Sequence, residues 1–200
     1  MANPNSPFGF LYDGRRDGSP PNFGNRVGLI ASANTNKIFT GDVLKPVAGG
    51  YLDVFTAPVG GGAPIGGIAG WFKWNSISQN KSVWQNWWPG NGDANGDVQA
   101  SYYADPFATF LVQCLLGPVA NTSVGLNANF NVGGGGQTFG AGNKSSFSLD
   151  DGTLGTGPSL PFKIYSLPNY SPLNPIFVQP GFDPTSAYNQ VLVTMNNLVA

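Results

Sequence analysis

The amino-acid sequence predicts an all-β protein: a single antiparallel β-sandwich or barrel, jelly-roll-like, with long Gly/Pro-rich loops and an extended N-terminal arm. Three observations support this prediction. The 200 residues include 29 Gly and 17 Pro, a share of turn-forming residues well above the usual one. All ten acidic residues are Asp, and Glu, a main component of solvent-facing helix surfaces, is absent. Short runs of aromatic and β-branched residues recur between the turn signals, which is typical of strands.

The longest strand-like run covers residues 98–116, VQASYYADPFATFLVQCLL. Apolar residues occupy both parities after Pro106, which predicts a strand covered on both faces in the middle of a sandwich or barrel. A buried helix is the competing interpretation of any apolar run. The strand is favoured because Pro106 lies within the run and Gly117-Pro118 ends it at strand-like length.

Residues 1–26 predict an extended N-terminal arm, because four prolines interrupt regular structure. Its apolar residues show no periodicity, yet they are too numerous for a disordered tail; they are Phe8, Phe10, Leu11, Tyr12 and Phe23. Such a segment is expected to lie on its own domain or on a neighbouring molecule.

Residues 27–200 are expected to form a single all-β domain, since no internal repeat or second hydrophobic core is evident. Alternation and turn signals predict its other strands at residues 27–33, 37–43, 51–57, 65–74, 121–131, 145–150, 162–167 and 188–196. Residues 133–142 predict a glycine-rich loop, and residues 167–186 a long Pro-rich excursion.

Residues 76–96 predict an aromatic loop that contains Trp84, Trp87 and Trp88. Its segment from Asp93 to Asp97 fails as a calcium loop, because Val98 occupies the sixth position and no Glu follows. A turn is the better interpretation. Exposed tryptophans can anchor a protein contact or stack on sugar rings, whereas Trp71 and Trp74 are expected in the core.

The residue inventory argues against catalysis. The chain has no His and no Glu, which removes the usual triads, Cys-His pairs and typical zinc sites. We therefore expect no enzyme, no cofactor and no metal. Cys114 is the only cysteine and is expected to be a core residue. With no secretory signal at the start, we expect a reducing assembly compartment.

Charge and hydropathy limit the partners. Only 10% of residues are charged, and the net charge is -1. The absence of a basic stripe argues against nucleic acid, and no apolar run is long enough for a membrane span. So little surface charge leaves a lone monomer poorly protected against association, so we expect a partner to cover much of the surface.

Five stretches resemble a family of small tailed-bacteriophage virion proteins whose genes lie near the major capsid protein gene. They are MANPNSPFGF (1–10), NKIFTGDVLKPV (36–47), IGGIAGWFKW (65–74), YYADPFATFLVQ (102–113) and VLVTMNN (191–197), about a quarter of the chain. The opening decapeptide and the Asp105-Pro106 stretch are the most specific. Members of this group resemble capsid decoration, or cement, proteins, which are all-β modules without catalytic residues.

The resemblance implies a structural virion protein that binds the outside of an assembled capsid and stabilises contacts between major capsid protein subunits. We expect a homo-oligomer on the capsid surface, assembled in the host bacterial cytoplasm. The alternative is a tail- or fibre-associated β-module that binds host glycan through tryptophans. The expected contact residues are Phe8, Phe10, Leu11, Tyr12, Phe23, Trp84, Trp87 and Trp88. Deleting residues 2–23 is expected to abolish capsid binding while leaving the domain folded.

Overall fold

The computed structural model describes residues 3–18, 25–57, 64–90, 92–133, 144–168, 183 and 185–198. Over these residues the protein is all-β, as predicted, and its only helical elements there are two short 3-10 turns, η1 (Ala48–Gly50) and η2 (Asn121–Ser123). Phe23, most of the glycine-rich loop and most of the Pro-rich excursion lie outside the described residues.

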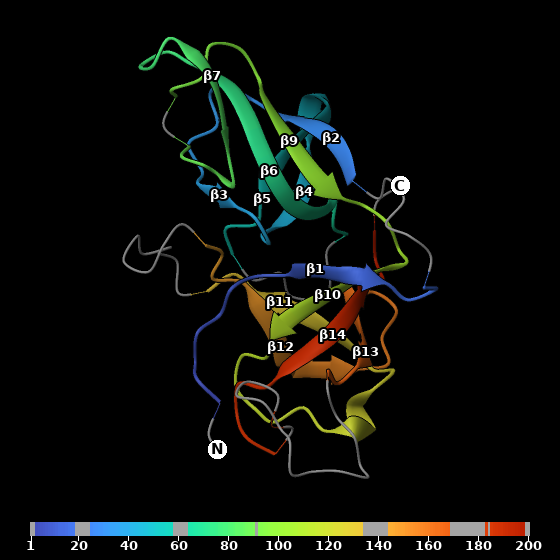
Figure 1. The fold of residues 1–200 in the computed structure, drawn as a ribbon. Helices are drawn as coiled ribbons and strands as arrows, with labels where there is room; N and C mark the ends of the chain where they lie inside the picture. Colours follow the sequence, from blue (N-terminus) through green and yellow to red (C-terminus); the bar gives the residue numbers. More distant parts are fainter. Residues whose placement is uncertain are drawn as a thin grey trace.

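The first sheet has six strands in the order β4-β5-β2-β9-β6-β7. Their bounds are β2 (Asn25–Ile30), β4 (Val43–Val47), β5 (Tyr51–Val54), β6 (Gly67–Ser76), β7 (Lys81–Gln85) and β9 (Val98–Tyr103). Because β4 also pairs with β6, five of these strands close into a ring and β7 remains outside it on the far side of β6. This sheet forms the upper half of the molecule in Figure 1, next to the two-stranded ribbon of β3 (Ile38–Phe39) and β8 (Trp87–Trp88).

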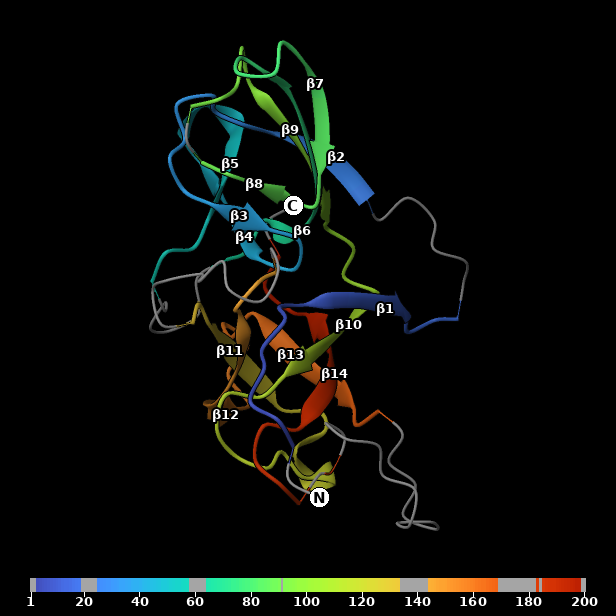
Figure 2. The ribbon, with the colours of Figure 1, turned by 60° about the vertical axis from the view of Figure 1, so that its left-hand side comes forward.

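The second sheet also has six strands, in the order β1-β10-β14-β13-β11-β12. Their bounds are β1 (Leu11–Arg15), β10 (Ala108–Gln113), β11 (Asn127–Asn131), β12 (Ser148–Gly155), β13 (Phe162–Ser166) and β14 (Gln190–Met195). The sheet curls until Cys114, just after β10, forms a bridge to Leu149 of β12. It makes the lower half of the molecule, and β1 lies across the junction between the halves (Figure 2).

The predicted single strand over residues 98–116 is wrong: it is two strands in different sheets. β9 belongs to the first sheet and β10 to the second, so the chain crosses between them at Asp105. There the Asp105 carboxylate accepts a hydrogen bond from the Phe107 N–H at 2.9 Å, and its carbonyl accepts one from Ala108 at 3.0 Å. Asp side chains that bond the backbone two residues on stabilise turns, and this one outweighs the strand propensity on either side.

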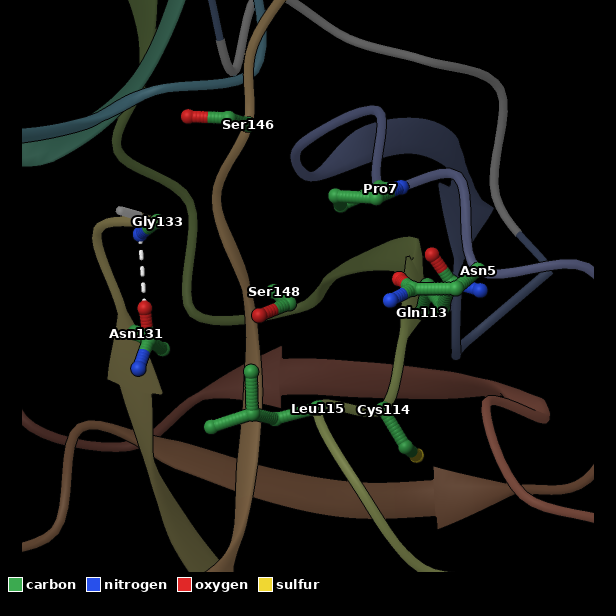
Figure 3. Close-up of a pocket in the computed structure, with 9 residues that line it drawn as sticks. All are labelled: Asn5, Pro7, Gln113, Cys114, Leu115, Asn131, Gly133, Ser146 and Ser148. Carbon is green, nitrogen blue, oxygen red and sulfur yellow. Dashed lines mark hydrogen bonds between the residues drawn. The ribbon is translucent and has the colours of Figure 1, made fainter. Parts of the chain in front are cut away.

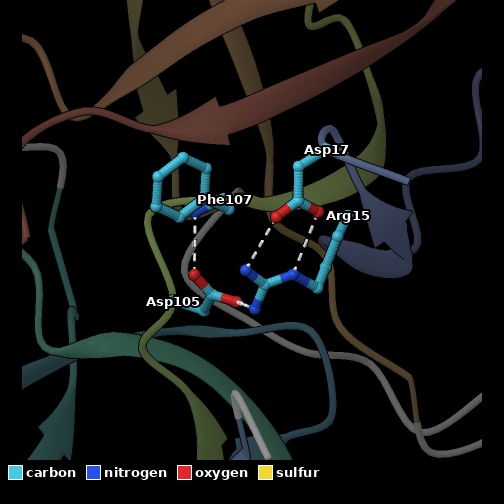
Figure 4. Close-up of polar contacts among 4 residues, drawn as sticks. All are labelled: Arg15, Asp17, Asp105 and Phe107. Atoms are coloured by element: carbon cyan, nitrogen blue, oxygen red, sulfur yellow. Dashed lines mark hydrogen bonds and ion pairs between the residues drawn. The ribbon is translucent and has the colours of Figure 1, made fainter. Parts of the chain in front are cut away.

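An arginine ties the N-terminal strand to this crossover. The guanidinium of Arg15, on β1, donates to the carboxylates of Asp105 and Asp17, as Figure 4 shows. The guanidinium of Arg16 lies 4.7 Å from the centre of the Phe107 ring. The backbone N–H of Arg16 donates a hydrogen bond to the Phe107 carbonyl. The charged residues near the N-terminus therefore fix the joint between the sheets.

Residues 3–18 of the predicted arm lie on the protein's own fold. β1 pairs antiparallel with β10 along Leu11–Leu111 and Tyr12–Phe110. Ahead of it, the Gln113 side chain donates to the Pro4 carbonyl at 2.6 Å and accepts from the Ser6 N–H at 3.1 Å. The prediction that the domain stays folded without residues 2–23 is therefore not supported by this structure, because the deletion would remove a strand.

The buried apolar residues of both sheets form one continuous core cluster. Phe10 contributes from the arm, 1% exposed, and stacks on Phe162 with ring centres 4.3 Å apart. Tyr12 stacks on Tyr103 of the first sheet at 4.7 Å. Aromatic rings packed at these distances bury large areas. The Tyr12–Tyr103 stack therefore holds β1 of the second sheet against β9 of the first, and the Phe10–Phe162 stack fixes the N-terminal segment on the second sheet.

The predicted aromatic loop over residues 76–96 is also wrong, because it contains β7 and β8. β7 pairs with β6 from Phe72–Gln85 to Ser76–Lys81 and forms a hairpin with it. Asn80, in the connecting turn, has a positive φ of 48°, which Asn tolerates better than most residues. The strand was not recognised in the sequence because polar residues surround Trp84. They are present because one side of β7 faces solvent.

Candidate binding surfaces of the first sheet

The β6–β7 hairpin has two different faces. On β6, Phe72 and Trp74 point into the core and are 0% and 4% exposed, whereas Trp71 and Lys73 are only half-buried. On β7, Val83 is buried and Trp84 is 58% exposed. Successive side chains of a strand point to opposite sides, so Trp71, Lys73 and Trp84 share the solvent side of the hairpin.

The register extends this solvent side across the sheet. Lys73 pairs with Trp84 of β7 and with Gln99 of β9, and Gln99 pairs with Leu29 of β2. Val27, two residues before Leu29, is on the same side; the two are 59% and 41% exposed. We call this surface the outer aromatic face; its residues are Val27, Leu29, Trp71, Lys73, Trp84 and Gln99.

Trp84 is held in place from β6. Its ring centre lies 4.6 Å from that of Trp71, and the Lys73 ammonium lies 5.0 Å from the Trp84 ring centre. A cation over an indole ring is attracted by the negative potential of the ring face. These contacts order a large apolar side chain on the surface, where its association with a partner would cost less conformational entropy.

The structure separates the eight residues that the sequence assigned to partner contact. Trp84 and Leu11 are exposed, 58% and 42%, but they belong to different sheets. Phe8, Tyr12 and Trp87 are half-buried, and Phe23 lies outside the described residues.

The prediction that Phe10 and Trp88 contact a partner is wrong. They are 1% and 0% exposed, and their side chains fill the protein's own core. Trp88 packs edge-on against Trp74 with ring centres 5.2 Å apart. A partner cannot reach either side chain in this fold, so both are removed from the proposed contact.

Sequence reasoning missed Val27, Leu29 and the outward direction of Trp71. Trp71 was expected in the core together with Trp74, but the two are three residues apart and so lie on opposite faces of a strand. That parity is visible in the sequence and could have separated them. Nothing local to Val27 and Leu29 indicates that their side is uncovered.

One cavity, of about 320 Å³, lies where the N-terminal segment crosses the end of β10 (Figure 3). Asn5, Pro7, Gln113 and Cys114 line it. Cys114 is 1% exposed, and its burial raises the pKa of the thiol, so the nucleophilic thiolate is disfavoured. Gln113 is already bonded to the backbone of Pro4 and Tyr188. Among the described residues that line this cavity, none is an activated nucleophile.

A larger groove, of about 500 Å³, lies on the other face of the β6–β7 hairpin. Trp74, Gln79, Gln85, Trp87 and Asp93 are among the residues that line it. The Asp93 carboxylate accepts hydrogen bonds from the Ser76 hydroxyl at 2.6 Å, from the Ser78 N–H at 2.8 Å and from the Trp74 indole at 3.4 Å. The Ser76 hydrogen bond, followed by that of the Ser78 backbone, lowers the pKa of Asp93 to about 2. The groove therefore keeps a fixed negative charge.

Within the described ranges, no group of three or more His, Cys, Asp or Glu side chains is placed to hold a metal ion. In the same residues, no helix has the length and apolar character that crossing a membrane requires. Comparison with protein-family models, with curated proteins and with solved structures finds no match to this chain. The comparisons thus assign no family, and function has to be argued from the surfaces described above.

Proposed function

We propose that this chain is a structural virion protein that binds the outside of an assembled phage capsid and stabilises contacts between major capsid protein subunits. The observation that carries the proposal is the outer aromatic face, which spans four strands and exposes Val27, Leu29 and Trp84 by 59%, 41% and 58%. Large apolar side chains gathered on one exposed surface mark interaction sites in soluble proteins. The resemblance of five stretches to phage virion proteins supplies the identity of the partner.

The proposed contact is anchored by Trp84. Tryptophan is over-represented among the residues that contribute most to protein interfaces, and a pocket on a capsid subunit would bury the part of the indole that Trp71 leaves open. Stable interfaces bury about 1,000 Å² or more in total, and symmetry repeats each contact over the shell. Many moderate contacts would then resist the pressure of packaged DNA together.

The shared core suits this role. Force applied to one sheet reaches the other through the Tyr12–Tyr103 stack and the continuous core rather than through a flexible linker. Three points remain predictions: assembly in the bacterial cytoplasm, a homo-oligomer on the capsid surface, and a jelly-roll-like fold.

The test uses particles of the phage whose genome encodes this chain, prepared from a strain in which its gene is deleted. Purified wild-type protein and a Trp84→Ala variant are mixed with these particles and co-sedimented over a range of concentrations. Loss of an interface anchor costs ~2 kcal/mol or more, so we expect the variant to bind at least ~30-fold more weakly.

Tyr165→Ala is the matched control, because Tyr165 is an aromatic residue on the second sheet that is 43% exposed. It is expected to bind particles like the wild type. If the wild-type protein does not co-sediment, or if Trp84→Ala binds as well as Tyr165→Ala, this proposal is refuted.

A further inference from the structure

The groove on the inner side of the β6–β7 hairpin has the features of a ligand site that is separate from the outer aromatic face. Trp74 of β6 and Gln85 of β7 line the groove, and their strand neighbours Lys73 and Trp84 belong to the outer aromatic face. Because neighbouring side chains of a strand point to opposite sides, the two surfaces lie on opposite faces of one hairpin. A partner bound to the outer aromatic face would leave the groove open.

The size of the groove fits a small ligand. Its volume of about 500 Å³ lies within the range of ~300–1,000 Å³ that is usual for small-molecule sites. Two of its lining residues face solvent: Ile77 is 61% exposed and Gln79 is also exposed, so the groove is open beside them. An extended ligand could therefore place one end inside and continue outward.

The groove is built before any ligand arrives. The Trp87 ring stacks parallel to that of Phe39, with centres 5.9 Å apart and an interplanar angle of 9°, which fixes the orientation of the indole. Asp93 is fixed by its bonds from Ser76 and Ser78. Side chains that are already ordered lose little entropy on binding, which favours affinity.

The chemistry of the lining selects the class of ligand. Asp93 remains a carboxylate at neutral pH, since its pKa is about 2, and the described residues that line the groove include no Lys or Arg. An anionic ligand would be repelled without compensation. A carboxylate accepts hydrogen bonds, while the carboxamides of Gln79 and Gln85 both donate and accept. The half-buried indole of Trp87 adds apolar surface beside these polar groups.

This combination matches a neutral saccharide, which presents hydroxyl groups at its edges and an apolar C–H face. We infer that the groove binds one or two hexose units of a neutral oligosaccharide, with Asp93 and Gln79 bonding hydroxyl groups and Trp87 packing against the ring. The inference does not rest on capsid binding, and its aromatic contact is Trp87 rather than the exposed Trp84.

The test begins with an array of neutral and anionic glycans, probed with the full-length chain. The best neutral glycan is then titrated by calorimetry into the wild type and three variants. We expect Trp87→Ala to weaken binding at least ~10-fold, which corresponds to the loss of one aromatic contact, and Gln79→Ala to weaken it ~5-fold through the loss of one hydrogen bond. Trp84→Ala, the matched control on the opposite face, is expected to bind the glycan like the wild type.

Gln79→Ala separates loss of binding from loss of folding. Gln79 is exposed in a turn, so its substitution should leave the fold intact, whereas Trp87 is half-buried. Three outcomes would each overturn the inference. They are binding of anionic glycans alone, no binding of any neutral glycan at ~10 mM, and equal losses of glycan affinity in Trp84→Ala and Gln79→Ala. Failure here is distinguishable from failure of capsid binding, since the particle assay responds to Trp84 and the glycan titration to Trp87 and Gln79.

Discussion

The most informative stability prediction concerns Phe10, which lies in the N-terminal segment and fills part of the common core. The ring is 1% exposed and stacks on Phe162 with centres 4.3 Å apart. Replacing a buried Phe by Ala removes the hydrophobic transfer energy of the ring and leaves a cavity, and such changes cost ~3–5 kcal/mol. The backbone around Phe10 offers little room for collapse, because its N–H bonds the Gly41 carbonyl at 2.9 Å. We therefore expect Phe10→Ala to lose ~4 kcal/mol of unfolding free energy.

Urea denaturation followed by tryptophan fluorescence would measure this loss. The adjacent Leu11→Ala is the matched control, because Leu11 is 42% exposed and its side chain points away from the core. A surface substitution of this kind changes stability by less than ~1 kcal/mol. If the two variants are equally stable, the N-terminal segment does not belong to the core and the reasoning fails.

Three further predictions concern a glycine, a carboxylate and the thiol. Gly67→Ala should lose more than ~2 kcal/mol of unfolding free energy, because a Cβ at its φ of 146° would lie 2.3 Å from the Tyr103 carbonyl oxygen. The control is Gly50→Ala, which is also at positive φ but has open space around it, and it should lose only ~1 kcal/mol. Equal losses of the two variants in urea denaturation would contradict the steric argument. The pKa of Asp93 is lowered to about 2 from 3.8, so its contribution to stability is complete above the unfolded-state pKa and is lost as pH falls toward 2. Asp93→Asn should therefore remove part of the loss of unfolding free energy between pH 4 and 2, and a pH profile identical to that of the wild type would refute this assignment. Cys114 should not react with a thiol reagent in the native protein but should react on unfolding, because it is buried and the pKa of its thiol is raised. Fast labelling of the native protein would contradict this prediction.

Several elements could be predicted because their signal is local. The strand expected at residues 65–74 is β6 (Gly67–Ser76), and that expected at 162–167 is β13 (Phe162–Ser166). The strand expected at 188–196 is β14 (Gln190–Met195). In each, β-branched or aromatic residues are concentrated between turn residues, and that pattern depends only on neighbours in the chain.

The candidate surfaces were only partly predictable. Trp84 and Trp87 were identified as functional candidates; Trp84 lies on the outer face of the β6–β7 hairpin, whereas Trp87, on β8, lines the groove on the other face. Trp88, in the same short segment, is fully buried against Trp74. Composition indicates that an indole can serve a contact or a core, but burial depends on which strands pack over it, and those strands are distant in sequence.

The sequence by itself determined the all-β class, because the lack of Glu and the abundance of Gly, Pro and Asp disfavour helices at every position. Tertiary structure alone decided that residues 98–116 divide between two sheets and that Phe10 belongs to the core. It also decided that Val27, Leu29 and Trp84 stay exposed on one side of the first sheet. The physical reason is that a strand satisfies its hydrogen bonds and buries its face only against partners, and the choice among partners is made by the packing of the whole chain.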